Sequence, residues 1–186
     1  MNSEYKVIIE KDGMKFVKTS KIQYQMIFSM QNPFIHLPDI INFDLIKLMH
    51  DLNPDIYEHV NLEKLNEKEA VITMIFRHFF ADLGLPKEYS YLHIERSESD
   101  NMIRFQLETV YSERPEIVPA EAQLIHLRSI SLLCDILNPH KVNVCCSVNI
   151  PDDDHLFPPF MEKFVGMMIY KIFNRLKQFI ENYRIT

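Results

Sequence analysis

Among the histidines and cysteines, which could bind a metal ion, the closest group in the sequence is His140, Cys145 and Cys146. Zinc sites use such residues, with spacings that let the ligands converge on a tetrahedron. Cys145 and Cys146 are adjacent, however, and in an extended strand their side chains point to opposite faces. They could not then bind one ion. We therefore predict no metal site and no cofactor.

Asp152, Asp153, Asp154 and His155 form a second group, immediately before an apolar segment. These residues could bind a divalent cation or act as a general acid and base. The calcium-loop pattern with its central glycine is absent. Aspartates before a helix commonly accept hydrogen bonds from its first backbone N–H groups. We interpret this group as a helix cap.

Catalytic patterns are also weak. Cys134 has no adjacent cation that would lower the pKa of its thiol, and acid/base pairs drawn from Asp82, Glu95 or Glu108 have no distinctive spacing. The chain has only three glycines, and it lacks the glycine-rich phosphate loops and the G-x-S-x-G motif. We predict no catalytic residues. An enzyme whose site is scattered over the fold stays as a third hypothesis.

The composition fits one globular domain: 186 residues, 47% hydrophobic and 25% charged, with a formal net charge of −6. An acidic chain is a poor partner for nucleic acid, because phosphate binding requires clustered lysine and arginine. Three cysteines cannot all pair within the chain, so free thiols and a reducing, intracellular location (cytoplasmic or nuclear) are expected. No apolar run reaches the ~18 residues of a membrane span, so no membrane insertion is expected.

The segment 152–186 predicts a long helix, which would organise the fold. Apolar residues recur every three or four positions in one stripe: Met161, Phe164, Val165, Met168, Ile172, Leu176, Phe179 and Tyr183. Ile169, Phe173 and Ile180 widen the apolar arc beyond the ~100° stripe of a surface helix. Such a helix should contact a sheet and also either the helix predicted at Asn66–Leu83 or another chain.

Strand patterns occur in both halves of the chain. Tyr5–Thr19 predicts a hairpin with an Asp12-Gly13 turn, and 89–96 with 102–111 predicts another. Val142–Ile150 alternates most regularly. Ile22–Met30 could be a third strand or the start of a helix.

Helices are predicted at Asp39–Leu52 and at Asn66–Leu83, where Asn66 and Glu69 have the spacing of a capping box. Ala122–Leu137 is interpreted as a strand that passes into a short helix. The order predicts a single α+β domain over 1–186, with an antiparallel sheet of about four to six strands covered by helices. Its segments are an N-terminal hairpin and connector (1–35), a helical segment (36–86), a β-rich segment (87–151) and the C-terminal helix (152–186).

The leading functional hypothesis is a non-enzymatic protein–protein interaction module: a subunit, adaptor or regulator that works as a homodimer or within a complex. The chain is rich in phenylalanine, tyrosine and methionine, which supply adaptable contact area. Five aromatic residues are predicted to form the interface: Phe34, Phe157, Phe160, Tyr170 and Phe173.

The alternative hypothesis is a binder of a small apolar ligand between the sheet and the C-terminal helix. One wall of the pocket would be formed by five residues of the helix: Phe164, Met168, Ile172, Leu176 and Phe179. Such pockets are mostly apolar with a few polar anchors, and His93, His126 or Tyr111 could serve as those anchors.

Overall fold

The computed structural model describes residues 5–151 and 159–184, excluding the side chains of residues 159 and 160. Its main feature is a ten-stranded sheet with the order β1-β2-β3-β10-β9-β7-β6-β5-β4, in which β8 pairs separately with β6. The strands are β1 (Lys6–Lys11), β2 (Met14–Ser20), β3 (Gln23–Gln31), β4 (Tyr57–Lys64), β5 (Glu69–Phe76), β6 (Glu88–Ser99), β7 (Met102–Thr109), β8 (Gln123–Leu124), β9 (Ser129–Asn138) and β10 (Lys141–Asn149). The helices are α1 (Leu37–Ile40), α2 (Phe43–Asp51), the short 3₁₀ helix η1 (Ala81–Leu83) and α3 (Pro159–Asn182).

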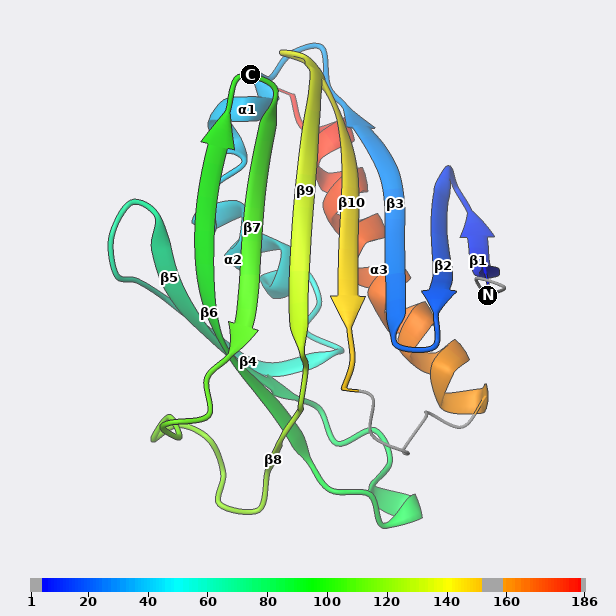
Figure 1. Ribbon diagram of the computed structural model, residues 1–186, viewed down its shortest axis with the longest axis vertical. Coiled ribbons are helices and arrows are strands. Elements are labelled where there is room, and N and C mark those ends of the chain that lie inside the picture. Colours follow the sequence, from blue (N-terminus) through cyan, green and yellow to red (C-terminus); the bar gives the residue numbers. More distant parts are fainter. Residues whose placement is uncertain (1–4, 152–158, 185–186) are drawn as a thin grey trace.

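The helices α2 and α3 lie on the same face of the sheet (Figure 1). Helix α3 contacts β1, β2 and β3 at one edge, α2 contacts β4 at the other edge, and the two helices contact each other. The sheet therefore curves around them, and we call the covered side its concave face. The predicted antiparallel α+β fold with a long C-terminal helix is confirmed, but the predicted number of strands is too low.

The predicted hairpins are present. Asp12 and Gly13 both have positive φ, 54° and 72°, as a two-residue turn between right-twisted strands requires. β6 and β7 form the second hairpin, and β10 follows the predicted alternation. Its residues Val142, Val144 and Cys146 are buried.

The predicted helix at Asn66–Leu83 is wrong, because this segment contains β5 instead. Asn66 accepts a hydrogen bond from the Lys68 backbone N–H and so forms the turn between β4 and β5 rather than a helix cap. β5 pairs with β4 on one side and β6 on the other. Its dense apolar run matched a helical period, but these two rows of backbone hydrogen bonds fix it as a strand.

Two other boundaries differ from the sequence interpretation. The predicted helix Asp39–Leu52 is divided into α1 and α2, because the Asn42 side chain accepts hydrogen bonds from the N–H groups of Asp44 and Leu45 and starts a new helix. The short helix predicted within Ala122–Leu137 is also wrong. β9 occupies that place and pairs with both β7 and β10.

Helix α3 is attached to the rest of the fold by apolar and charged contacts. Gly166 allows close approach, since a Cβ atom there would lie 2.9 Å from the ring of Phe16. Asp55, just before β4, pairs with Lys171 and Arg175 of α3, and the hydrogen bond from Arg175 is the main cause of the lowered pKa of Asp55. The predicted contact of this helix with a helix at Asn66–Leu83 is wrong, because that segment is not helical; α3 contacts α2 instead. Among the described helices, none combines the length and hydropathy of a membrane span.

Candidate functional site

A cavity of about 280 Å³ lies between the concave face of the sheet and α3. Most of its lining is apolar and comes from many strands. The main apolar residues of the sheet that line it are Phe16, Met74, Phe76, Leu92, Leu107, Ile130, Leu132, Val148 and Ile150. The volume is close to the lower end of the ~300–1,000 Å³ range of ligand sites. A second, apolar cavity beside Leu176 measures only about 20 Å³.

The C-terminal helix forms one wall of the larger cavity. Phe164, Met168 and Ile172 line it, as the ligand-binding hypothesis predicted. The other two predicted wall residues lie elsewhere. Leu176 lines the smaller cavity, and Phe179 is 40% exposed.

Charged groups enclose one side of the cavity. The Glu162 carboxylate accepts hydrogen bonds from the Tyr24 hydroxyl at 2.7 Å and from Lys18 at 2.8 Å, and it also pairs with Lys6 at 3.3 Å. Burial alone would raise the pKa of Glu162, but the hydrogen bonds from Lys18 and Tyr24 outweigh burial, so the pKa is lowered. This carboxylate therefore fixes the start of α3 to β1, β2 and β3.

The opposite side carries polar groups of a different kind. His50 of α2, Tyr57 of β4 and Ser90 of β6 all line the cavity and are only 8%, 6% and 1% exposed. The His50 and Tyr57 rings meet edge to face, with centroids 4.9 Å apart. Burial lowers the pKa of His50 to about 4 and raises that of Tyr57. Both groups are therefore neutral near pH 7. We call these three residues the polar end of the cavity.

The loop between β5 and β6 covers another part of the cavity. The rings of Phe79 and Phe80 meet that of Phe164 at centroid distances of 5.5 and 4.8 Å. These contacts join the loop to α3. Arg77, which also lines the cavity, donates its Nε hydrogen to the Pro54 carbonyl.

Cysteine chemistry is suppressed at this site. Cys146 lines the cavity, and burial raises the pKa of its thiol to about 12. The thiol therefore stays protonated at neutral pH and is a poor nucleophile. The three cysteines are unpaired. Cys145 is half-buried whereas Cys146 is buried, which fits their predicted opposite facing.

Of the five predicted interface residues, the three with described side chains have different surroundings. Phe34 is 54% exposed, with the Arg184 guanidinium 4.9 Å from its ring centroid. Tyr170 donates a hydrogen bond to Asp12. Phe173 is 5% exposed and lines the cavity. Phe157 and the side chain of Phe160 lie outside the described residues, as does the predicted aspartate cap.

The predicted polar anchors of the ligand are also wrong. Tyr111 is 61% exposed and stacks on His126, away from the cavity lining. His93 follows the buried Leu92 on β6, so it points to the opposite, convex face of the sheet. The sequence interpretation missed His50, Tyr57 and Ser90. One signal existed: Ser90 is a polar residue in the same strand register as the apolar Leu92 and Ile94.

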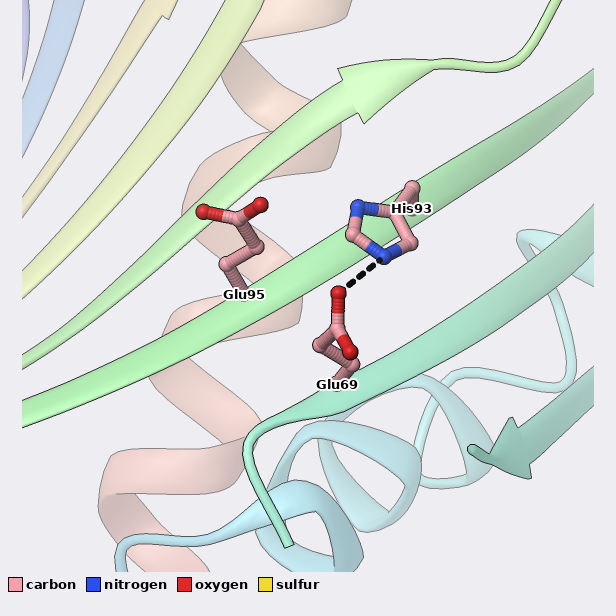
Figure 2. Close-up of side chains that lie close together, drawn as sticks. All are labelled: Glu69, His93 and Glu95. Atoms are coloured by element: carbon pink, nitrogen blue, oxygen red, sulfur yellow. Dashed lines mark ion pairs between the residues drawn. The ribbon is translucent and has the colours of Figure 1, made fainter. Parts of the chain in front are cut away.

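On the convex face, Glu69, His93 and Glu95 bring three possible metal-ligand atoms within 4.8 Å of one another. Figure 2 shows His93 pointing to Glu69, with an Nε2–Oε1 distance of 3.3 Å, and Glu95 beside them. Glu69 and Glu95 are direct cross-strand partners. We call these residues the convex-face cluster. The ion pair of His93 with Glu69 accounts for part of this grouping without a metal ion.

No family model matches the sequence, and no curated protein does. Solved structures resemble it in fold. A human StarD13 (DLC2) lipid transfer and protein localization domain has a TM-score of 0.70 at 9% identity, over 98% of this chain and 91% of that chain. Human StAR-related lipid transfer protein 5 has a TM-score of 0.67 at 10% identity, over 97% and 88%. A STAR-related lipid transfer protein from Xanthomonas axonopodis has a TM-score of 0.65 at 12% identity, over 95% and 98%. At these identities the likeness concerns the fold alone: this chain has the fold of the StAR-related lipid transfer proteins.

Proposed function

We propose that the chain binds a small apolar molecule in the cavity between its sheet and α3, without chemical conversion. The observation that carries this proposal is the cavity itself: about 280 Å³, with a mostly apolar lining. Protein interiors are normally packed so closely that voids larger than one water molecule are few. A space of this size therefore requires an explanation.

The apolar lining of the cavity supports a ligand. Most of the residues that line it are apolar, and apolar surface left in contact with water forgoes about 25 cal/mol per Å² of stabilisation. A bound apolar molecule would recover that free energy.

The named neighbours give further support by analogy, since they are lipid transfer proteins by name. This evidence favours the ligand-binding hypothesis over the protein-interaction hypothesis. The protonated Cys146 thiol and the apolar lining favour binding over catalysis. Interaction through the exposed Phe34 stays a prediction.

A test uses two neighbouring methionines of α3. Met168 lines the cavity, whereas Met167 is 55% exposed. The chain has no tryptophan, so each variant Met168→Trp and Met167→Trp carries a single reporter. The probe is N-phenyl-1-naphthylamine, an uncharged fluorophore that brightens in apolar surroundings.

We expect the wild-type protein to bind the probe with saturation. Met168→Trp should weaken binding at least tenfold, because the indole fills part of the cavity, whereas Met167→Trp should leave the dissociation constant unchanged. Absence of saturable binding to the wild type, or equal weakening by the two substitutions, would refute the proposal.

A further inference from the structure

We propose that the convex-face cluster, Glu69, His93 and Glu95, binds a divalent transition-metal ion of the Zn²⁺ class. Glu69 lies on β5, whereas His93 and Glu95 lie on β6. The cluster is on the face of the sheet opposite to the cavity, so this inference is independent of the proposed function. The site was not predicted from the sequence, because Glu69 is distant in the sequence from the other two residues.

The pairing of β5 with β6 holds the three side chains together on one face. Glu69 and Glu95 are direct cross-strand partners, and His93 precedes Glu95 by two positions on the same strand. Successive side chains of a strand point to opposite faces. Ala70 and Ile94 are both 0% exposed, so the residues beside them point outward. Figure 2 shows the three outward side chains gathered above the two strands.

The spacing of the donor atoms fits a metal site. The three possible ligand atoms all lie within 4.8 Å of one another, and His93 Nε2 lies 3.3 Å from Glu69 Oε1. Zinc bonds to nitrogen and oxygen measure about 2.0–2.2 Å, which places two ligand atoms of a tetrahedral site about 3.3–3.6 Å apart. The observed distance falls in this range and exceeds the ~2.7–2.9 Å of a charge-assisted hydrogen bond. Glu95 is exposed, so rotation of its side chain can bring its carboxylate equally close.

Asn66 orients the Glu69 carboxylate for this role. The Asn66 side chain donates a hydrogen bond to Glu69 Oε2 at 2.6 Å, and it accepts one from the Lys68 backbone N–H, which fixes it in the turn between β4 and β5. The other carboxylate oxygen, Oε1, is the one that faces His93. Hydrogen bonds of this kind orient metal ligands and increase the affinity for the ion.

The charge around the cluster favours a cation. Glu69 and Glu95 carry like charges in opposite positions, and Glu108 of β7 lies opposite His93. Within the described ranges, no lysine or arginine pairs with any of these three carboxylates. Like charges in cross-strand positions repel each other. A divalent ion between the carboxylates would replace this repulsion with attraction to both strands.

The types of ligand atom select the kind of ion. One imidazole nitrogen and two carboxylate oxygens suit ions such as Zn²⁺, Co²⁺ and Mn²⁺, whereas Ca²⁺ and Mg²⁺ prefer sites made of oxygen alone. Three protein ligands leave at least one coordination position for water. We therefore expect one Zn²⁺ ion per chain, in a site that is open to solvent.

The experiment titrates the full chain, freed of metal by a chelator and then desalted. Calorimetry measures Zn²⁺ binding, and visible absorption measures Co²⁺ binding. We expect saturable binding of one ion per chain, and cobalt d–d absorption without the strong near-ultraviolet band of a thiolate ligand. A thiolate band would assign the ion to a cysteine and would overturn the proposal.

Variants then assign the ion to the cluster. Glu95→Gln and His93→Gln each remove one ligand and should weaken Zn²⁺ binding about tenfold or more. His36→Gln is the matched control, because His36 also lies beside a carboxylate, that of Asp39, at 3.0 Å. In the described part of the chain, that pair belongs to no group of three possible ligands. Its loss should leave the dissociation constant unchanged.

The outcomes decide this proposal separately from the proposed function. Absence of saturable Zn²⁺ binding to the wild type would overturn it, and so would binding that survives both cluster substitutions, since the ion would then lie elsewhere in the chain. Circular dichroism checks that each variant is folded. Because the cluster and the cavity are on opposite faces of the sheet, saturating Zn²⁺ should leave the affinity for N-phenyl-1-naphthylamine unchanged. Failure of one proposal therefore leaves the other standing.

Discussion

The two faces of the sheet use the same residue type in opposite ways. His50, packed against the concave face, is buried edge to face with Tyr57, and burial lowers its pKa to about 4. His93, on the convex face, is half-exposed and lies 3.3 Å from Glu69 (Figure 2). The comparison teaches that a histidine enclosed on the concave side is kept neutral by burial, whereas a half-exposed histidine on the convex face lies beside a carboxylate.

The separation follows the strand period of two. Along β6, Leu92 and Ile94 are 1% and 0% exposed, and the residues between and after them, His93 and Glu95, belong to the convex-face cluster. A charge moved by one position along a strand therefore passes from solvent into the core.

Introducing aspartate at neighbouring positions of β10 should give the largest difference in the free energy of unfolding. Val144 is 3% exposed, so Val144→Asp should cost at least about 3 kcal/mol, the scale of an unpaired buried charge. The Asn143 side chain accepts a hydrogen bond from Ser29 at 2.6 Å, and Asn143→Asp keeps an acceptor there. Its effect should stay within about 0.5 kcal/mol. Urea unfolding followed by circular dichroism measures both, and equal losses would contradict the assignment of the two faces.

The second effect is a pH dependence of stability caused by His50. Its pKa is about 4 in the folded state and 6.5 as the reference value. Between these values the unfolded chain binds more protons than the folded one, so stability falls as the pH falls below 6.5. From pH 7 to pH 5 we expect a loss of roughly 2 kcal/mol.

Denaturant unfolding of His50→Phe at the two pH values tests this sign. The variant should lose less stability on acidification than the wild type, whereas His93→Gln should keep the full His50 contribution. Asp55 and Glu58 also have lowered pKa values. The ordinary pKa values of these two carboxyl groups are 3.8 and 4.5. Most of the stability that they contribute is therefore lost below pH 5, outside the range from pH 7 to pH 5. An identical pH dependence in His50→Phe and wild type would disprove the role of His50.

The smallest effect concerns the convex-face cluster. Glu69 of β5 and Glu95 of β6 are opposite each other on adjacent strands. Like charges in such a pair destabilise the sheet slightly. Glu95→Gln should raise the melting temperature by roughly 1–2 °C, and added salt should reduce this gain. Both melting temperatures are measured with a chelator present, so that no bound ion offsets the repulsion. An unchanged melting temperature in Glu95→Gln would contradict this repulsion.

Elements with one clear period could be predicted from the sequence. The alternation in β10 and the apolar stripe of α3 each match a single period, and both elements formed where expected. β5 could not be recognised, because its dense apolar run fits a strand and a helix equally well. Pairing with β4 and β6, which involves residues distant in the sequence, decided between them.

The site was harder to predict than the fold. Three wall residues of α3 were recognised because they share one helix face. The polar end combines His50, Tyr57 and Ser90 from three separate elements, and no short spacing relates them. The wide apolar arc of α3 indicated a second contact, but the helix expected to provide it, at Asn66–Leu83, is wrong, and α2 takes that place. Sequence alone could not show that part of this arc lines open space.

The pairing of β3 with β10 has a kinetic consequence. Met30 pairs with Val142, so the centre of the sheet joins segments from near the two ends of the chain. Such non-local contacts slow folding, because a long loop must close before its pairing is gained. The cavity acquires its wall of β2 and β3 only when this closure is complete. We therefore expect the binding site to form late in folding.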